Sequence, residues 1–280
     1  MRAVVVRSLD GPDGLELSEV AEPGGSHPAA DGARQLVVVH AAGVAVPDQL
    51  QSRGEYQLAT PPPFVSGGEV AGVVREAPDG CGFAVGDRVA GMVIWGAMAE
   101  LALAVPKYTV RIPDGMSYAE GAALWLNYST AWFGIERAGV RSGETVLVQG
   151  AAGGVGTAAL DLLRGIGARS IAVVSSDEKE QVARSMGADE VVRSSGAWLD
   201  EVRTLTGGLG VDVVLDPVGG EVYTRSLPTL NPLGSIVAIG FAGGLWQDPS
   251  VQWLVGRNAS VFGFYLGRLM KLQPEHVRAR

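Results

Sequence analysis

A short apolar run that ends in glycines and passes directly into a helical pattern constrains this chain more than any other feature. The run covers Val146–Gln149, the glycines lie within Gly150–Gly156, and apolar residues at helical spacing follow. A doubly wound α/β domain uses this order of strand, turn and helix to present the positive end of a helix to a pyrophosphate. A plain structural turn is the alternative. The predicted backbone contacts to a dinucleotide in this turn are Gly153, Gly154, Val155 and Gly156.

Strand-like and helix-like runs alternate from this turn onward, which is typical of a parallel sheet covered by helices. Further strands are expected at Ser170–Val174, Glu190–Val192, Asp212–Leu215, Ser235–Ile239 and Ser260–Phe264. Helices are expected at Thr157–Gly165, Lys179–Met186, Ala197–Leu205 and Arg225–Leu230. The pattern predicts an α/β fold whose doubly wound parallel sheet, of the Rossmann type, occupies residues 118–262.

The first part of the chain, residues 1–117, has a different pattern, in which short strand-like runs are separated by glycine and proline turns. The expected strands are Ala3–Val6, Leu15–Val20, Leu36–His40, Val70–Arg75, Arg88–Val93 and Ala99–Val105. A helical pattern then runs from Ser117 to Ala138, and Glu120 stands where it completes a capping box with Ser117. The first part is therefore predicted to be a β-rich domain.

Charge and composition exclude several classes of partner. The net charge is −8 and no run of Lys or Arg is present, so neither nucleic acid nor an anionic membrane is an expected partner. No apolar run approaches the roughly 20 residues that span a bilayer. The single cysteine, Cys81, cannot form an internal disulfide, which fits a reducing compartment and a cytoplasmic location.

Metal binding is not expected from the residues present. The chain has three histidines and one cysteine, and these are scattered along the sequence. A zinc site needs about three or four protein ligands at close spacing, and no such cluster is visible.

Several motifs follow one another along the chain in a fixed order. They are Pro63–Gly72, Val85–Val89, Ile112–Gly115, Thr130-Ala131, Gly143–Thr145, Gly150–Gly156, Gly187–Asp189, Gly210–Val214, Asp216–Gly220 and Ile239–Phe241. This series, which covers most of the chain, resembles the zinc-free branch of the medium-chain dehydrogenase/reductase superfamily, the quinone oxidoreductase-like enzymes. In the zinc-dependent relatives, a cysteine and a histidine stand where this chain has Ala45 and Gly68.

The resemblance implies a GroES-like catalytic domain at 1–117, a Rossmann domain at 118–262, and a segment at 263–280 that begins a return to the catalytic domain. Relatives of this kind continue further, so the chain that ends at Arg280 is expected to be shortened. A homodimer is also expected.

The activity implied by the resemblance is hydride transfer from NADPH, without zinc, to a quinone or an α,β-unsaturated carbonyl compound. Two alternatives stay open. One is an enoyl-thioester reductase, which uses the same hydride geometry. The other is a non-catalytic NADPH-binding or interaction protein.

The choice of cofactor depends on the residues after the second strand of the parallel sheet. An acidic residue there would accept hydrogen bonds from the adenosine ribose and repel a 2′-phosphate. This chain has Ser175 and Ser176, with Lys179 shortly after, although Asp177 is close by. Hydroxyl groups and a cation favour NADPH over NADH. Ser175 is also a candidate N-cap for the following helix, and by resemblance Arg193 is a candidate contact on the adenosine side.

The resemblance also indicates residues for the nicotinamide end of the site. Asp48 is expected to orient the nicotinamide ribose or a water, with a helix N-cap as its alternative role. Tyr56 is the nearest candidate proton donor, since a phenol can donate a hydrogen bond to a developing oxyanion; a wall of the pocket is the alternative. The catalytic candidates are thus Tyr56 and Asp48. The predicted nicotinamide-end contacts are Val46, Asp48, Thr130, Gly240 and Phe241.

Overall fold

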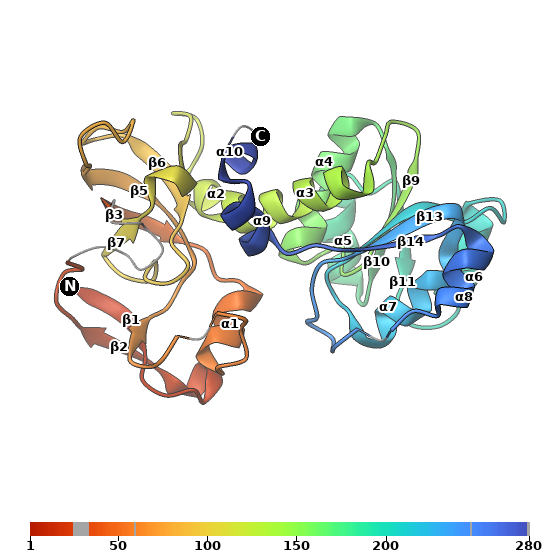
Figure 1. Ribbon diagram of the computed structural model, residues 1–280, viewed down its shortest axis with the longest axis horizontal. Coiled ribbons are helices and arrows are strands. Elements are labelled where there is room, and N and C mark those ends of the chain that lie inside the picture. The colour runs from red at the N-terminus through yellow and green to blue at the C-terminus, as the bar shows by residue number, and fades with distance from the viewer. Residues whose placement is uncertain (25–33, 59, 247, 279–280) are drawn as a thin grey trace. The chain divides into compact units, whose positions relative to one another are not determined.

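The computed structural model describes residues 1–24, 34–58, 60–246 and 248–278, whose contacts form two compact units (Figure 1). The first unit contains Met1–Leu126 together with Gln273–Arg280, and the second contains Asn127–Leu272. The glycine turn lies in the second unit.

The second unit is built on a parallel sheet that has six strands among the described residues, in the order β11-β10-β9-β12-β13-β14. The chain builds outward from β9 to β11 and then returns to the other side of β9, so the strand order reverses between β9 and β12. Ligands of such sheets bind outside the carboxyl ends of the strands at this point. The strands are β9 (Thr145–Val148), β10 (Arg169–Val174), β11 (Glu190–Arg193), β12 (Val211–Asp216), β13 (Leu230–Ala238) and β14 (Ser260–Gly263).

Helices cover both faces of this sheet, because successive side chains of a strand point to opposite faces. Val146 and Val148 of β9 pack in one core with α3 and α4, whereas Leu147 packs in the other core with α6 and α7. The predicted doubly wound parallel sheet is confirmed. The helices are α3 (Ser129–Ala138), α4 (Gly154–Ile166), α5 (Asp177–Ser185), α6 (Trp198–Leu205), α7 (Gly220–Ser226), α8 (Val251–Arg257) and α9 (Leu266–Leu272), with a 3-10 turn at Leu227–Thr229.

The first unit contains two antiparallel sheets, in the orders β2-β1-β4 and β7-β3-β5-β6-β8. The predicted β-rich character is confirmed. The strands are β1 (Arg2–Val6), β2 (Leu15–Glu19), β3 (Gln35–Ala42), β4 (Phe64–Val65), β5 (Glu69–Glu76), β6 (Arg88–Met92), β7 (Leu101–Ala104) and β8 (Thr109–Arg111). The helices are α1 (Val46–Ser52), α2 (Tyr118–Ala123) and α10 (Pro274–Arg278), with 3-10 turns at Gly11–Gly14 and Pro106–Tyr108.

The helical stretch after Ser117 is not one continuous α-helix. The capping box is present, since the Ser117 Oγ accepts from the Glu120 N–H at 3.2 Å and Glu120 accepts from the Ser117 N–H at 2.7 Å. A π-helical turn, Leu124–Tyr128, separates α2 from α3; it is called the π segment below. The contacts of the chain divide inside this segment rather than at residue 117, because α2 packs on the first unit, where Gly121 lies against Ala71 and Ile112.

Several helices differ from the sequence-based expectation, among them α1 and α9, which were not expected. The helix expected at Arg225–Leu230 begins earlier, at Gly220, because Gly219 has a φ of +71° and ends the preceding loop. Helix α8 was not expected, since it lacks a buried face that would give an apolar period. Within the described ranges, no helix has both the length and the apolar character needed to cross a membrane.

Candidate cofactor site

Two glycines shape the turn between β9 and α4. Gly150 has a φ of +56°, a conformation that favours glycine, and a Cβ at this position would lie 2.9 Å from the Cγ2 of Val218. A Cβ on Gly156 would lie only 2.4 Å from the carbonyl oxygen of Gly150. These glycines therefore let the first turn of α4 pack directly on the loop that leads into it.

Three backbone amides at the start of α4 are free to bind an anion. The N–H groups of Gly154, Val155 and Gly156 donate to no acceptor in the described part of the chain. The Gly153 N–H is different, because it donates to the Gly150 carbonyl oxygen at 2.8 Å. Free amides and the positive end of a 13-residue helix suit a phosphate group. The residues present thus fit the pyrophosphate of a dinucleotide.

The loops that follow β12 and β13 lie beside the glycine turn. Gly150 faces Val218 in the loop after β12, and a Cβ on Gly240, in the loop after β13, would lie 2.4 Å from the Pro217 carbonyl oxygen. A Cβ on Gly219 would in turn lie 3.1 Å from the Cα of Phe241. The structure therefore brings Gly240 and Phe241 to the same edge of the sheet as the glycine turn, at the point where the strand order reverses.

Asp216 organises this edge and was missed by the sequence analysis as a site residue. It is the last residue of β12 and is fully buried. Its Oδ1 accepts from the N–H groups of Val218 and Gly219, each at 2.9 Å, whereas its Oδ2 is buried with no partner among the described residues. Burial raises the pKa of this carboxyl group, and the two N–H donors partly oppose that. An aspartate at the end of an apolar strand was the available signal.

The residues after β10 form the expected polar cluster, with one correction. Ser176, and not Ser175, is the N-cap of α5, because the Ser176 Oγ accepts from the Lys179 N–H at 3.3 Å. The Ser176 hydroxyl also donates to Glu178 at 2.9 Å. Ser175 lies one residue too early to cap the helix, and its Oγ accepts from the Lys179 Nζ at 3.0 Å instead. Ser175 and Lys179 therefore form a hydrogen-bonded pair of exposed side chains after β10.

Arg193, the last residue of β11, is held by carboxylates of α5. Its Nη2 pairs with Asp177 and, at 2.6 Å, with Glu180. Its Nη1 is buried without a partner in the described ranges. The guanidinium therefore offsets the negative charge that Asp177 brings to this end of the site.

The candidates on α1 and just after it lie in the first unit. Val46 begins α1 and is exposed, and Tyr56 is half-buried in the loop that follows the helix. Asp48 is buried at the third position of α1, where its Oδ2 accepts from the Ala45 N–H at 2.7 Å. The N-cap is therefore Ala45 and not Asp48. Asp48 lies inside the first turn, and its carboxylate accepts a hydrogen bond from the N–H of the N-cap residue. Thr130 is buried in α3 of the second unit.

A second buried carboxylate, Glu69, lies near Asp48 and was not identified as functional from the sequence. Glu69 begins β5 and accepts from the Leu126 N–H in the π segment. Burial raises its pKa to about 7, the Leu126 N–H lowers it, and the negative charge of Asp48 raises it. Burial likewise raises the pKa of Asp48, against the N–H groups of Ala45 and Gly68.

Comparison with known proteins places this geometry in a family. The chain matches the models described as "Alcohol dehydrogenase GroES-like domain" over residues 32–114 and "Zinc-binding dehydrogenase" over residues 154–278. It is 39% identical over 272 residues to quinone oxidoreductase-like protein 2 of Rattus norvegicus, covering 95% of this chain and 75% of that protein. The chain belongs to the medium-chain dehydrogenase/reductase superfamily, among its quinone oxidoreductase-like proteins.

Solved structures of this superfamily share the fold. A probable oxidoreductase from Mycobacterium abscessus is 39% identical with a TM-score of 0.90, and the match covers 100% of this chain and 84% of that one. The quinone oxidoreductase of Thermus thermophilus, solved alone and with NADPH, is 33% identical with a TM-score of 0.82, covering 100% and 85%. The CurK enoyl reductase is 28% identical with a TM-score of 0.85, covering 99% and 84%. This member of the superfamily is an oxidoreductase.

One matching family model has a zinc-binding name, but the described residues of this oxidoreductase do not supply the cluster of ligands that a zinc site needs. Ala45 and Gly68, which by resemblance replace a cysteine and a histidine, carry no ligand atom. Among the described residues, no group of three or more His, Cys, Asp or Glu side chains is arranged to hold a metal. The described part of the chain therefore offers zinc no set of ligands.

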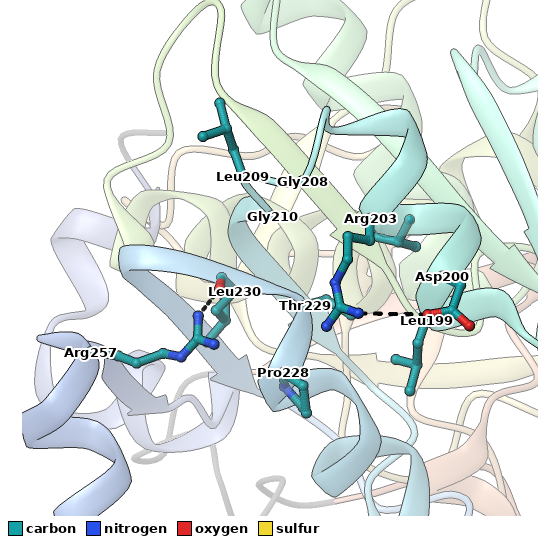
Figure 2. A pocket seen from close by; sticks show the side chains of 11 residues that line it. Leu199, Asp200, Arg203, Gly208, Leu209, Gly210, Pro228, Thr229, Leu230 and Arg257 are labelled. Carbon is teal, nitrogen blue, oxygen red and sulfur yellow. Dashed lines mark hydrogen bonds and ion pairs between the residues drawn. The ribbon is translucent and has the colours of Figure 1, made fainter.

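A cavity of about 150 Å³ in the second unit is separate from the candidate cofactor site (Figure 2). Its lining includes Gly210 and Leu230, which stand at the amino ends of β12 and β13. Arg257 donates to the Leu230 carbonyl oxygen at 3.0 Å, and Arg203 pairs with Asp200 (Figure 2). The strands are parallel, so this cavity lies at the opposite edge of the sheet from the glycine turn.

Proposed function

We propose that this oxidoreductase binds NADPH and catalyses hydride transfer, without zinc, to a quinone or an α,β-unsaturated carbonyl compound. The observation that carries the proposal is the set of three unpaired amides at the start of α4, at the reversal point of the parallel sheet. The NADPH complex of the T. thermophilus relative supports the choice of ligand.

The residues of the glycine turn would bind and orient the pyrophosphate. The N–H groups of Gly154, Val155 and Gly156 lie at the helix start, where the helix dipole also favours a negative charge. Gly240 and Phe241 lie in the loop after β13, at the edge of the sheet on which the nicotinamide half would lie. When bound, NADPH supplies a hydride from C4 of its nicotinamide.

The polar cluster after β10 would select NADPH over NADH. The Lys179 ammonium has three N–H donors, one of which goes to the Ser175 Oγ, and the Ser175 O–H is free to donate to a 2′-phosphate oxygen. Ser176 contributes less, because its hydroxyl already caps α5 and donates to Glu178. Arg193 acts indirectly by pairing with Asp177 and Glu180, which offsets part of their negative charge.

At the acceptor end, Tyr56 is the candidate that donates a hydrogen bond to the oxyanion that develops on the substrate. Val46, Asp48 and Thr130 stay proposed as nicotinamide contacts on the resemblance alone. Asp48 is proposed to act by fixing the start of α1, since its carboxylate holds the Ala45 N–H.

A turnover screen with the full chain tests the proposal. Loss of NADPH absorbance is followed with p-benzoquinone, cyclohexenone and crotonyl-coenzyme A, each with NADPH and with NADH. We expect oxidation of NADPH, faster than that of NADH, by the quinone or the enone. Absence of NADPH oxidation by both the quinone and the enone would overturn the proposal.

The two alternatives give different results in the same screen. An enoyl-thioester reductase, which the structural similarity to CurK favours, oxidises NADPH only with the thioester. A non-catalytic binding protein binds NADPH tightly and turns over none of the three acceptors.

A further inference from the structure

The last two residues of the π segment, Asn127 and Tyr128, both lie against α4. Tyr128, at its last position, donates from its hydroxyl to the Asp161 Oδ2 of α4 at 3.2 Å. The residue before it, Asn127, lies next to the first residue of α4. A Cβ on Gly154 would be 2.5 Å from the Oδ1 of Asn127 and 2.7 Å from its Nδ2. Glycine at position 154 therefore leaves the space that the Asn127 carboxamide occupies.

The carboxamide of Asn127 has no partner of its own. The side chain is half-buried and makes no hydrogen bond within the described ranges of the chain. A primary amide offers two N–H donors and one acceptor oxygen, and the half-buried Asn127 amide keeps these groups available to a ligand beside it. The neighbouring N–H groups of Gly154, Val155 and Gly156 are also unpaired. Four unpaired donor groups are thus gathered at one helix start.

We propose that Asn127 is a cofactor-binding residue, whose Nδ2 donates a hydrogen bond to the pyrophosphate held at the start of α4. This inference rests on the proposed NADPH binding and adds a side-chain donor to a site otherwise built from backbone. Because the Tyr128–Asp161 bond fixes the adjacent residue to α4, the amide is already in place before the ligand arrives.

Two variants test the proposal through NADPH affinity measured by isothermal titration calorimetry. Asn127→Ala removes the donor, and we expect binding roughly 10- to 100-fold weaker, the cost of a hydrogen bond to a charged group. Asn127→Asp keeps the shape but places a negative charge beside the phosphates. We expect a larger loss that shrinks when ionic strength rises to about 0.5 M, because salt screens like charges.

The matched control is Asn258→Asp, which adds the same charge beside β14 at the amino edge of the sheet. We expect it to bind NADPH as the unmodified chain does. Affinities within about twofold for both Asn127 variants, or a lower melting temperature of the ligand-free variant with unchanged affinity and salt dependence, would overturn the inference and leave the proposed function standing. An unmodified chain that does not bind NADPH removes both. If Asn127→Asp does not fold, Asn127→Ala decides.

Discussion

At the scale of single residues, the buried carboxylate of Glu69 links the titration of this chain to its stability. Glu69 is 3% exposed, and burial raises its pKa from 4.5 to about 7. The folded state therefore holds the proton more tightly than the unfolded state between these two values. The contribution of Glu69 to the free energy of unfolding is therefore highest below pH 4.5, falls as the pH rises from 4.5 to about 7, and is level above that.

Glu69→Gln should remove this contribution. The amide oxygen of glutamine still accepts from the Leu126 N–H, but nothing at this position titrates. The free energy of unfolding of the variant, minus that of the unmodified chain, should grow by about 3 kcal/mol between pH 4.5 and pH 7. Urea unfolding across this pH range measures the difference, with Glu76→Gln at the exposed end of β5 as control. A difference that does not change with pH would contradict the prediction.

Lys179 decides between the two nicotinamide cofactors if the proposal for the adenosine end is right. Lys179→Ala removes the cation beside Ser175 and should weaken NADPH binding roughly tenfold or more. NADH, which lacks the 2′-phosphate, should bind almost as before. Titration of both cofactors measures the ratio of affinities, and Lys271→Ala in α9 is a control for loss of a surface lysine in the same unit. Equal losses for the two cofactors would count against the assignment.

At the scale of elements, α4 joins the sheet to the ligand through its first turn. Gly153 is its N-cap, with a φ of −83° that any residue can adopt. Aspartate is a favoured N-cap, so a carboxylate here would bind the free amides of Val155 and Gly156 itself. An aspartate at position 153 would thus stabilise the start of the helix through the same kind of hydrogen bond that we propose for the phosphate.

Gly153→Asp should therefore abolish measurable NADPH binding while the chain stays folded. The introduced carboxylate occupies the amides and repels the pyrophosphate. Calorimetry gives the affinity and far-ultraviolet circular dichroism the fold. The control is Gly165→Asp, at the exposed far end of the same helix, where a new Cβ meets no atom within 4 Å among the described residues. Retained affinity in Gly153→Asp would show that the turn is purely structural.

At the scale of the whole molecule, two units with separate cores are expected to respond differently to the ligand. The glycine turn, the loops beside it and the polar cluster after β10 all belong to Asn127–Leu272. A ligand that binds only the folded state stabilises it by an amount set by its concentration relative to its dissociation constant.

NADPH at 100 times its dissociation constant should raise the free energy of unfolding by about 2.7 kcal/mol. The effect should fall mainly on the transition that reports on the second unit, which contains Trp132, Trp198, Trp246 and Trp253. Urea unfolding followed by tryptophan fluorescence, with and without NADPH, measures it. The shift should be absent in Gly153→Asp, and saturated binding without any shift in the unmodified chain would contradict the prediction.

The glycine turn, the alternation of strands and helices and the β-rich first part could all be predicted from the sequence, because each is a local pattern of spacing and turn residues. Local pattern also sufficed for the polar cluster after β10, but it misassigned the helix cap. Ser175 and Ser176 are adjacent and equally good caps by type, and only the backbone geometry assigns the cap to Ser176.

The tertiary structure alone decided which distant residues meet. Asn127, in the π-helical turn, lies against Gly154, and Glu69 accepts from the N–H of Leu126, which is 57 residues away in the sequence. Asp216 faces inward because the loop after β12 folds over the glycine turn. None of these contacts has a period or spacing in the sequence, since each depends on how complete elements pack. The sequence by itself determined where a phosphate is expected, and packing within the second unit determined that Asn127 and the loop after β12 lie beside that place.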